Sequence, residues 1–188
     1  SPEEILIKIS ICNRGKDAAV LHLLPTLWFR NTWSWSEGSH KPSLEQATDP
    51  KGMTVITASH PDLGTRYLWC EGEVPLLFTE NETNSERVFG QPNRSPYVKD
   101  GIHQYVVHGQ RQAVNPLLTG TKASAHYQFT VDGGATQVVR LRLSAVAAPE
   151  AGDKGSVASF EKRFDETMKK RLQEADAFYN GIAAPSLG

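Results

Sequence analysis

The sequence has few cysteines and no surplus of charge of either sign. Cys12 and Cys70 are its only cysteines, and each lies in an apolar, strand-like stretch rather than in a C-x-x-C or His-rich setting. We therefore expect two separate buried thiols, since a disulfide would require their strands to be neighbours. The 20 basic and 21 acidic residues nearly cancel, and no stretch concentrates positive charge. Nucleic acid is therefore not an expected partner.

Long apolar runs and the common catalytic motifs are also missing. No run approaches the roughly 18 to 20 apolar residues of a membrane-spanning helix, so we expect no membrane partner. No signal-peptide pattern opens the chain, which leaves the cytoplasm as the expected compartment. The sequence contains no G-x-S-x-G elbow, P-loop, G-x-G-x-x-G or calcium-loop pattern, and we expect no cofactor. His103 and His108 are five positions apart rather than the four of a helical metal pair, so we expect no metal site.

Alternating apolar residues predict a series of short strands. Isoleucines occupy every second position from 5 to 11, which predicts a strand with one strongly buried face. Residues 20 to 35 are largely apolar and interrupted by Pro25, which predicts two strand segments bent there and largely buried on both faces. Further strands are predicted at 53 to 58, 66 to 70 and 75 to 79.

Residues 125 to 131 and 138 to 143 also alternate, and Asp132-Gly133-Gly134 lies between them. A glycine-rich turn between two alternating segments predicts a hairpin. Residues 36 to 52 and 80 to 109 have loop composition, the second with a short helical piece around Ile102.

Near the C-terminus the apolar period changes from two to between three and four. Phe160, Phe164, Met168 and Leu172 follow this spacing among charged residues, which predicts an amphipathic helix. We therefore predict a mainly β fold, an antiparallel, supersandwich-like β-sandwich at 1–148, followed by a linker and this helix at 149–188.

The stretch LWFRNTWSW at 27 to 35 contains three of the four tryptophans. Flat indole rings stack on the C–H faces of sugars, and neighbouring polar side chains can bind hydroxyls. Trp33, Trp35, Arg30 and Asn31 are therefore candidate substrate-binding residues. The alternative is that these rings fill the core of the sandwich.

A second candidate group follows the predicted strand at 75 to 79. Glu80, Asn81, Glu82 and Asn84 are candidate substrate-binding residues. The two carboxylates at spacing two are compatible with hydroxyl binding, a divalent cation or acid/base catalysis. A glycosidase pair, however, faces across the bond at about 5 to 10 Å, which adjacent positions on one strand rarely do. The alternative is a solvated strand end.

Seven stretches form a wider pattern: NRG at 13–15, LHLLPTLWFRNTWSW at 21–35, LLFTENETN at 76–84, PYVKDGIH at 96–103, AVNP at 113–116, GTKASAHY at 120–127 and EADAFY at 174–179. This pattern resembles the N-terminal, non-catalytic β-domain region of large bacterial proteins similar to glycoside hydrolase family 63. That group contains processing α-glucosidases and mannosylglycerate hydrolases. The resemblance covers most of residues 5 to 180.

The resemblance implies a sandwich that packs against a following (α/α)6 catalytic barrel, with the C-terminal helix as the connection. In this family the general acid and base lie on the barrel, so the resemblance implies that the chain contains no catalytic residue and would be inactive alone. The parent protein would be an inverting, α-glucosidase-like hydrolase of oligosaccharides, and the loops around the Trp-rich and TENETN segments would close over the barrel mouth. The alternatives are a stand-alone carbohydrate-binding module and a purely structural domain.

Overall fold

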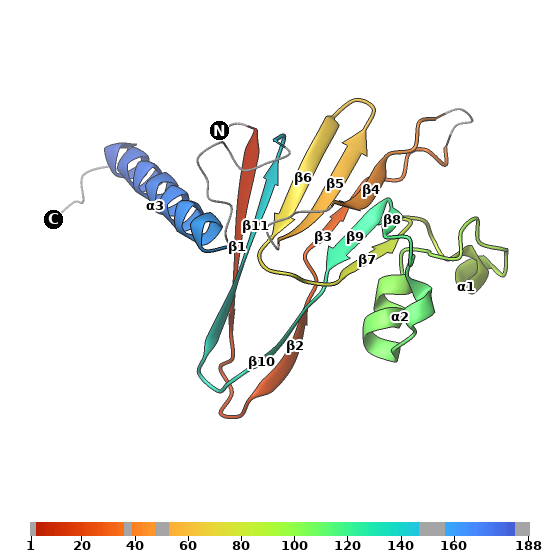
Figure 1. Ribbon diagram of the computed structural model, residues 1–188, viewed down its shortest axis with the longest axis horizontal. Coiled ribbons are helices and arrows are strands. Elements are labelled where there is room, and N and C mark those ends of the chain that lie inside the picture. The colour runs from red at the N-terminus through yellow and green to blue at the C-terminus, as the bar shows by residue number, and fades with distance from the viewer. Residues whose placement is uncertain (1–2, 36–38, 48–52, 147–156, 183–188) are drawn as a thin grey trace. The chain divides into compact units, whose positions relative to one another are not determined.

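A computed structural model of the chain describes residues 3–35, 39–47, 53–146 and 157–182. Within these residues the fold is mainly β, with eleven strands in three antiparallel sheets (Figure 1). The chain divides into two compact units, Ser1–Ala147 and Ala148–Gly188. The strands are β1 (Glu4–Cys12), β2 (Ala19–Leu23), β3 (Thr26–Trp28), β4 (Ser43–Ala47), β5 (Thr54–His60), β6 (Gly64–Cys70), β7 (Leu76–Thr79), β8 (Thr119–Gly120), β9 (Lys122–Ala125), β10 (Tyr127–Val131) and β11 (Thr136–Ser144). The helices are α1 (Ser85–Phe89), α2 (Gly101–His108), the 3₁₀ turn η1 (Arg111–Ala113) and α3 (Val157–Ile182).

The first unit is an antiparallel β-sandwich, as predicted. A six-stranded sheet has the order β1-β11-β6-β5-β4-β8, and a three-stranded sheet has the order β3-β9-β7. One hydrophobic core contains residues of both sheets, among them Ile56 and Leu141 from the larger and Phe78 and Ala123 from the smaller. Since a fully buried Leu, Ile or Phe side chain contributes roughly 1.5 to 3 kcal/mol, the facing surfaces of the sheets stabilise the unit.

A long antiparallel ribbon connects the two sheets. One half of the ribbon contains β1, β2 and β3, and the other contains β9, β10 and β11 (Figure 1). Pairing extends from Glu4 opposite Ser144 to Trp28 opposite Lys122. The bend predicted at Pro25 is confirmed, because β2 ends before this residue and β3 begins after it.

The predicted hairpin between residues 125–131 and 138–143 is wrong in its pairing. β10 pairs with β2, whereas β11 pairs with β1 and β6. The Asp132–Gly134 turn instead lies against the turn after β1, where the Gly134 amide donates to the Asn13 carbonyl at 2.8 Å. The observed pairing gives β11 nine partner residues in β1, more than the five residues of β10 could supply.

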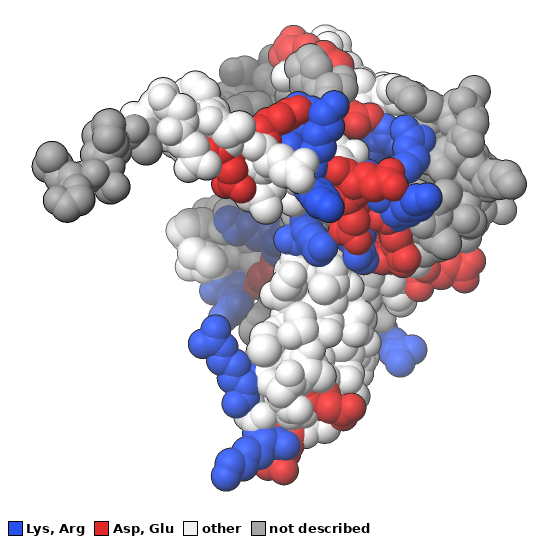
Figure 2. All heavy atoms as spheres, turned by 90° about the vertical axis from the view of Figure 1, so that its left-hand side faces the viewer, with Lys and Arg blue, Asp and Glu red and all other residues white. Residues whose placement is uncertain are grey.

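The expected burial of β1, β2 and β3 is also wrong. Ile5 and Ile7 are 57% and 38% exposed, and Val20 and Trp28 are exposed as well. The physical reason is position, because β1 and β3 are sheet edges and β2 pairs only with β10. Cys12, at the end of β1, is likewise exposed, whereas Cys70 is buried as expected. Figure 2 shows uncharged side chains along the middle of the lower part of the view and charged side chains of both signs at its lower end.

Two of the predicted loops contain regular structure. Strand β4 lies within the expected loop at 36 to 52, and it pairs with the next strand, β5, and with β8, which is remote in sequence. The helical piece expected around Ile102 is confirmed as α2, while the short helix α1 was missed. Helix α2 packs through Ile102 on Leu77, and its first residue, Gly101, is required because a Cβ there would lie 2.2 Å from the Ala113 carbonyl oxygen.

The described part of the second unit is α3, which confirms the predicted amphipathic helix. Its 26 residues include the Phe160 and Phe164 rings, whose centroids are 5.9 Å apart. Leu172, Phe178 and Tyr179 are exposed. Of the helices in the described ranges, none is long and apolar enough to cross a membrane.

Candidate functional site

The residue after β7 forms side-chain contacts with two other segments of the chain. Glu80 follows β7 directly, and its Oε2 accepts a hydrogen bond from the Thr121 hydroxyl at 2.7 Å. Its Oε1 lies 2.8 Å from the Lys41 ammonium, and only 15% of the Glu80 side chain is exposed. Glu80 therefore connects the segment before β4 and the residue between β8 and β9 to β7.

Asn81 fixes the Trp-rich segment to the same point. Its backbone amide donates to the Thr121 hydroxyl oxygen at 2.8 Å, and its side-chain amide donates to the Phe29 carbonyl at 2.8 Å. The Phe29 amide in turn donates to the Thr121 carbonyl at 3.1 Å. Both polar groups of Phe29 are thus bonded, and the chain leaves β3 in a defined direction.

Glu82 holds the next part of the Trp-rich segment. Its Oε1 accepts a hydrogen bond from the indole N–H of Trp33 at 3.1 Å, and both side chains are half-buried. Its carbonyl accepts the Lys99 amide at 3.0 Å. Glu82 therefore holds Trp33 on one side and the segment that leads into α2 on the other.

The chain turns immediately after Arg30, so the strand expected to continue to residue 35 ends earlier, at Trp28. Asn31 Oδ1 accepts the Ser34 amide at 3.2 Å, and the Trp35 amide donates to the Thr32 carbonyl at 3.2 Å. A side-chain acceptor three residues before the bonded amide is typical of such polar turns.

The four tryptophans occupy three different environments. Trp69 is buried, Trp33 is half-buried, and Trp28 and Trp35 are 54% and 66% exposed. The guanidinium carbon of Arg30 lies 5.3 Å from the centroid of the Trp35 ring, within the range of a cation–π interaction. The three indole rings of residues 27 to 35 therefore do not fill the hydrophobic core, because two of them lie mostly at the surface.

Asn84 has a structural position at the start of α1. Its Oδ1 accepts the Arg87 amide at 3.1 Å and so caps the helix. The same oxygen accepts the Asn93 side-chain amide at 3.1 Å, and Asn84 Nδ2 lies 3.2 Å from both carboxylate oxygens of Asp100. These bonds hold the α1 loop, residues 83 to 97, against the start of α2.

Between the Trp-rich segment and the α1 loop lies a polar cleft of about 320 Å³, which we term the loop cleft. Hydroxyl, amide, carboxylate and guanidinium groups dominate its wall. The lining residues are Asn31, Ser34, Glu82, Thr83, Ser85, Gln91, Pro92 and Arg94. Of the residues predicted from the sequence, the structure brings Asn31 and Glu82 into this cleft, with Trp33 bonded to Glu82 at its edge.

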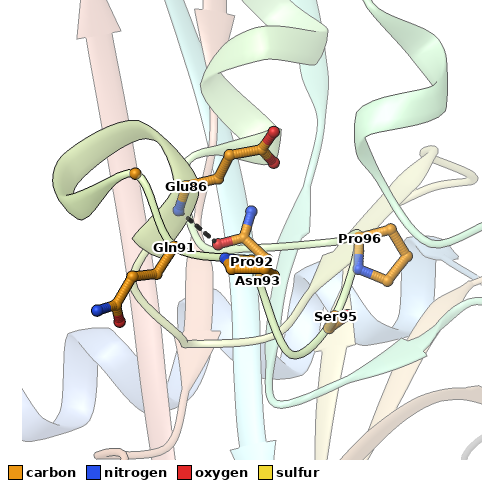
Figure 3. Close-up of a pocket in the computed structure, with 7 residues that line it drawn as sticks. Glu86, Gln91, Pro92, Asn93, Ser95 and Pro96 are labelled. Atoms are coloured by element: carbon orange, nitrogen blue, oxygen red, sulfur yellow. Dashed lines mark hydrogen bonds between the residues drawn. The ribbon is translucent and has the colours of Figure 1, made fainter.

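A second hollow of about 620 Å³ is lined by residues of the α1 loop and shares Gln91 and Pro92 with the loop cleft. In Figure 3 the Asn93 side chain turns toward α1, where its Oδ1 accepts the Glu86 amide at 3.2 Å. The side chains of Glu86 and Gln91 extend in opposite directions from it. Gln91 therefore lies where the two hollows meet.

The sequence interpretation missed Gln91 and Arg94 as cleft residues. They lie seven or more positions beyond the last predicted site residue, Asn84, and reach the cleft because the chain reverses after α1. The reversal is marked by Gly90, which has a left-handed φ of 68° and ends the helix. That glycine, followed by Pro92, was the available signal.

Four of the six histidines form two pairs rather than a metal cluster. His22 Nδ1 lies 2.7 Å from His126 Nε2, and the His103 and His108 rings are 5.3 Å apart. Burial, followed by the neighbouring His22, lowers the pKa of His126. Across the residues that the structure describes, no group of three or more His, Cys, Asp or Glu side chains could hold a metal ion.

Comparison with known proteins gives a relative but no family. No family model matches the chain. The chain is 32% identical over 206 residues to the uncharacterized protein YMR196W of Saccharomyces cerevisiae. The match covers 95% of this chain but 19% of the yeast protein, so the chain spans about a fifth of the length of this relative. The relative is a yeast protein, so the match gives no support to the bacterial source suggested by the resemblance.

Proposed function

We propose that this chain is the non-catalytic β-sandwich portion of a larger glycoside hydrolase, and that its loop cleft binds part of an oligosaccharide. The observation that carries the proposal is a cleft of hydrogen-bonding side chains beside a segment that exposes Trp35. Sugars present hydroxyls at their edges and C–H groups on their faces, so polar groups and a flat ring together suit them.

The contacts of the two carboxylates support a structural role rather than a catalytic one. Glu80 is held by Lys41 and Thr121, and Glu82 accepts the indole N–H of Trp33. Both carboxylates therefore have structural partners already. The proposal therefore places the general acid and base on another part of the parent protein. This placement is compatible with these contacts and with the greater length of the yeast relative.

The proposed reaction of the parent protein is inverting hydrolysis of an α-glucoside-like oligosaccharide. Such a reaction needs one carboxylic acid and one carboxylate about 6.5 to 9.5 Å apart, with a water on the opposite face of the sugar ring. In this proposal an (α/α)6 barrel supplies both groups, and the sandwich contributes substrate contacts and a docking surface for the barrel.

Titration of the 188-residue chain with glucose-containing oligosaccharides, followed by the four indole N–H signals in NMR, tests the binding. We expect the Trp35 signal to shift and the Trp69 signal to stay, because Trp35 is exposed and Trp69 is buried. Trp35→Ala should weaken binding by about tenfold, which corresponds to about 1.4 kcal/mol. Trp28→Ala is the matched control, because Trp28 is also exposed but lies on β3, whereas Trp35 directly follows the cleft residue Ser34.

Four unmoved indole signals would contradict the binding proposal. Equal losses in Trp35→Ala and Trp28→Ala would show that the loop cleft is not the site. If the 188-residue chain binds oligosaccharide but the parent protein has no glycosidase activity, the alternative of a carbohydrate-binding module is favoured.

The catalytic assignment has its own test in the intact parent protein. Glu80→Gln and Glu82→Gln should each leave kcat within tenfold of the parent value. Loss of a general acid or base instead costs about 10²- to 10⁴-fold. Hydrolysis by the 188-residue chain alone would overturn the assignment.

A further inference from the structure

A separate groove lies between α2 and the β3–β9 strand pair, on the side of the smaller sheet that carries α2. Its volume is about 280 Å³, and we term it the α2 groove. None of its lining residues is shared with the loop cleft. The lining residues are Leu24, Thr26, Lys99, Ile102, His103, Val106, Val107, Lys122 and Ser124.

Most of the groove wall is apolar or already hydrogen-bonded. Leu24, Ile102 and Val106 also belong to the cluster that packs α2 on the sheet. The Thr26 hydroxyl donates to the Leu24 carbonyl at 2.8 Å and lies 2.7 Å from the Ser124 hydroxyl. Because Thr26 has one hydroxyl hydrogen, Ser124 is the donor between the two. A ligand in this part of the groove therefore gains by burying apolar surface.

One end of the groove carries positive charge. Lys122 is half-buried, and its ammonium donates to the Lys99 carbonyl at 2.9 Å. This bond uses one of the three ammonium hydrogens and leaves two for another acceptor. Lys99 and His103 are further cationic or proton-binding groups on the wall, and the lining contains no aspartate or glutamate.

The Asp100 carboxylate offsets only part of this positive charge. The Asp100 carboxylate lies 3.2 Å from the Arg87 guanidinium and is also bonded by Asn84. Within the described ranges, neither Lys99 nor Lys122 forms an ion pair. Burial, followed by the neighbouring Lys99, lowers the pKa of Lys122, and the Asp100 carboxylate, which acts in the opposite direction, does not offset these two effects.

We propose that the α2 groove binds a small monocarboxylate with an apolar body, the carboxylate at Lys122 and Lys99 and the body along α2. The volume is near the lower end of the range for ligand pockets, about 300 Å³, so a single ring or a short alkyl chain fits. The charged end and the apolar wall together select against neutral sugars and against fully polar anions. This site is independent of the proposed oligosaccharide binding.

The test compares two probes of nearly equal shape and different charge, 3-phenylpropionate and 3-phenyl-1-propanol. Each is titrated into the 188-residue chain, and the backbone amide signals of Ile102, Val106 and Ser124 are followed by NMR. We expect both probes to perturb these signals, with the carboxylate binding at least tenfold more tightly. This comparison requires no substitution and so does not depend on the folding of a variant.

Lys122→Met keeps the aliphatic stem and removes the ammonium, and it should lower the affinity for 3-phenylpropionate about tenfold without changing that for the alcohol. Lys16→Met, in the turn after β1, is the control and should change neither. Absence of shifts at the three reporters with both probes would overturn the proposal. Equal affinity for the acid and the alcohol, or an unaltered acid affinity in Lys122→Met, would overturn the role of the charged end.

Discussion

The contacts of Glu80 predict that this residue stabilises the fold. Glu80→Ala removes the acceptor of the Thr121 hydroxyl, and Thr121 is only 1% exposed. Loss of a hydrogen bond to a charged group costs roughly 1.5 to 3 kcal/mol. The Lys41 side chain is 46% exposed and can be hydrated when its partner is removed, so the ion pair adds at most about 1 kcal/mol. We expect Glu80→Ala to lower the free energy of unfolding by about 2 to 4 kcal/mol.

Glu80→Gln separates the two contributions. The amide oxygen can still accept from Thr121, whereas the attraction to Lys41 is lost. The cost should therefore be about 1 kcal/mol or less. Glu73→Ala is the control, because Glu73 is exposed between β6 and β7 and a surface substitution of this kind is usually within about 0.5 kcal/mol.

Urea unfolding followed by tryptophan fluorescence measures all three variants. With a slope of about 1 to 3 kcal/mol per molar urea, a loss of 3 kcal/mol lowers the midpoint by about 1 to 3 M. If Glu80→Ala were as stable as Glu73→Ala, the reasoning from burial and hydrogen bonding would be refuted. If Glu80→Gln were as unstable as Glu80→Ala, the ion pair with Lys41 would be the larger contribution, contrary to its exposure.

Three further predictions concern other parts of the chain. Cys12 is exposed and should react with a thiol reagent at pH 8 in the native chain. Burial raises the pKa of Cys70 to about 12 and should prevent its reaction until urea is added. Two reactive thiols in the native chain would contradict this prediction. The pKa of His126 is lowered below 6.5 by burial and by His22, so the unfolded chain binds more protons and stability should fall as the pH drops through 6.5. His22→Gln should weaken this dependence in urea unfolding measured from pH 5 to 8 without removing it, because the burial of His126 is the larger cause; an unchanged pH profile would show that His22 does not contribute. Gly133→Ala places a Cβ 2.2 Å from a backbone oxygen of the turn after β1. It should lower the free energy of unfolding, measured in urea, by about 1 to 3 kcal/mol. An unchanged free energy of unfolding would mean that the two turns can separate freely.

Local sequence patterns predicted the positions of the strands better than the pairing between them. The strands β5, β6 and β7 and the bend at Pro25 follow from alternation and from proline chemistry, which act within a few residues. The pairing of β11 with β1 joins residues at opposite ends of the sandwich unit, as in Glu4 opposite Ser144. A local glycine turn favours a hairpin, but the longer non-local pairing contributes more hydrogen bonds and prevails.

The candidate site was predictable in composition but not in arrangement. The sequence interpretation selected Asn31 and Glu82, and both line the loop cleft. It assumed that residues 31 to 35 continue a strand, whereas Asn31 bonds the Ser34 amide and turns the chain. Side-chain to backbone bonds of this kind compete with strand formation, and alternation in the sequence does not reveal them.

The structure connects the stability of the sandwich with the shape of the loop cleft. Three consecutive residues after β7, Glu80 to Glu82, hold the Trp-rich segment, the segment before β4 and the entry to α2. The strand that precedes them is fully buried, with Phe78 and Thr79 at 0% exposure. The cleft walls are therefore positioned by an element that moves only when the core opens. A substitution that weakens Glu80 or Asn81 should thus lower oligosaccharide affinity even though neither residue lines the cleft, because it loosens the wall that contains Asn31 and Glu82.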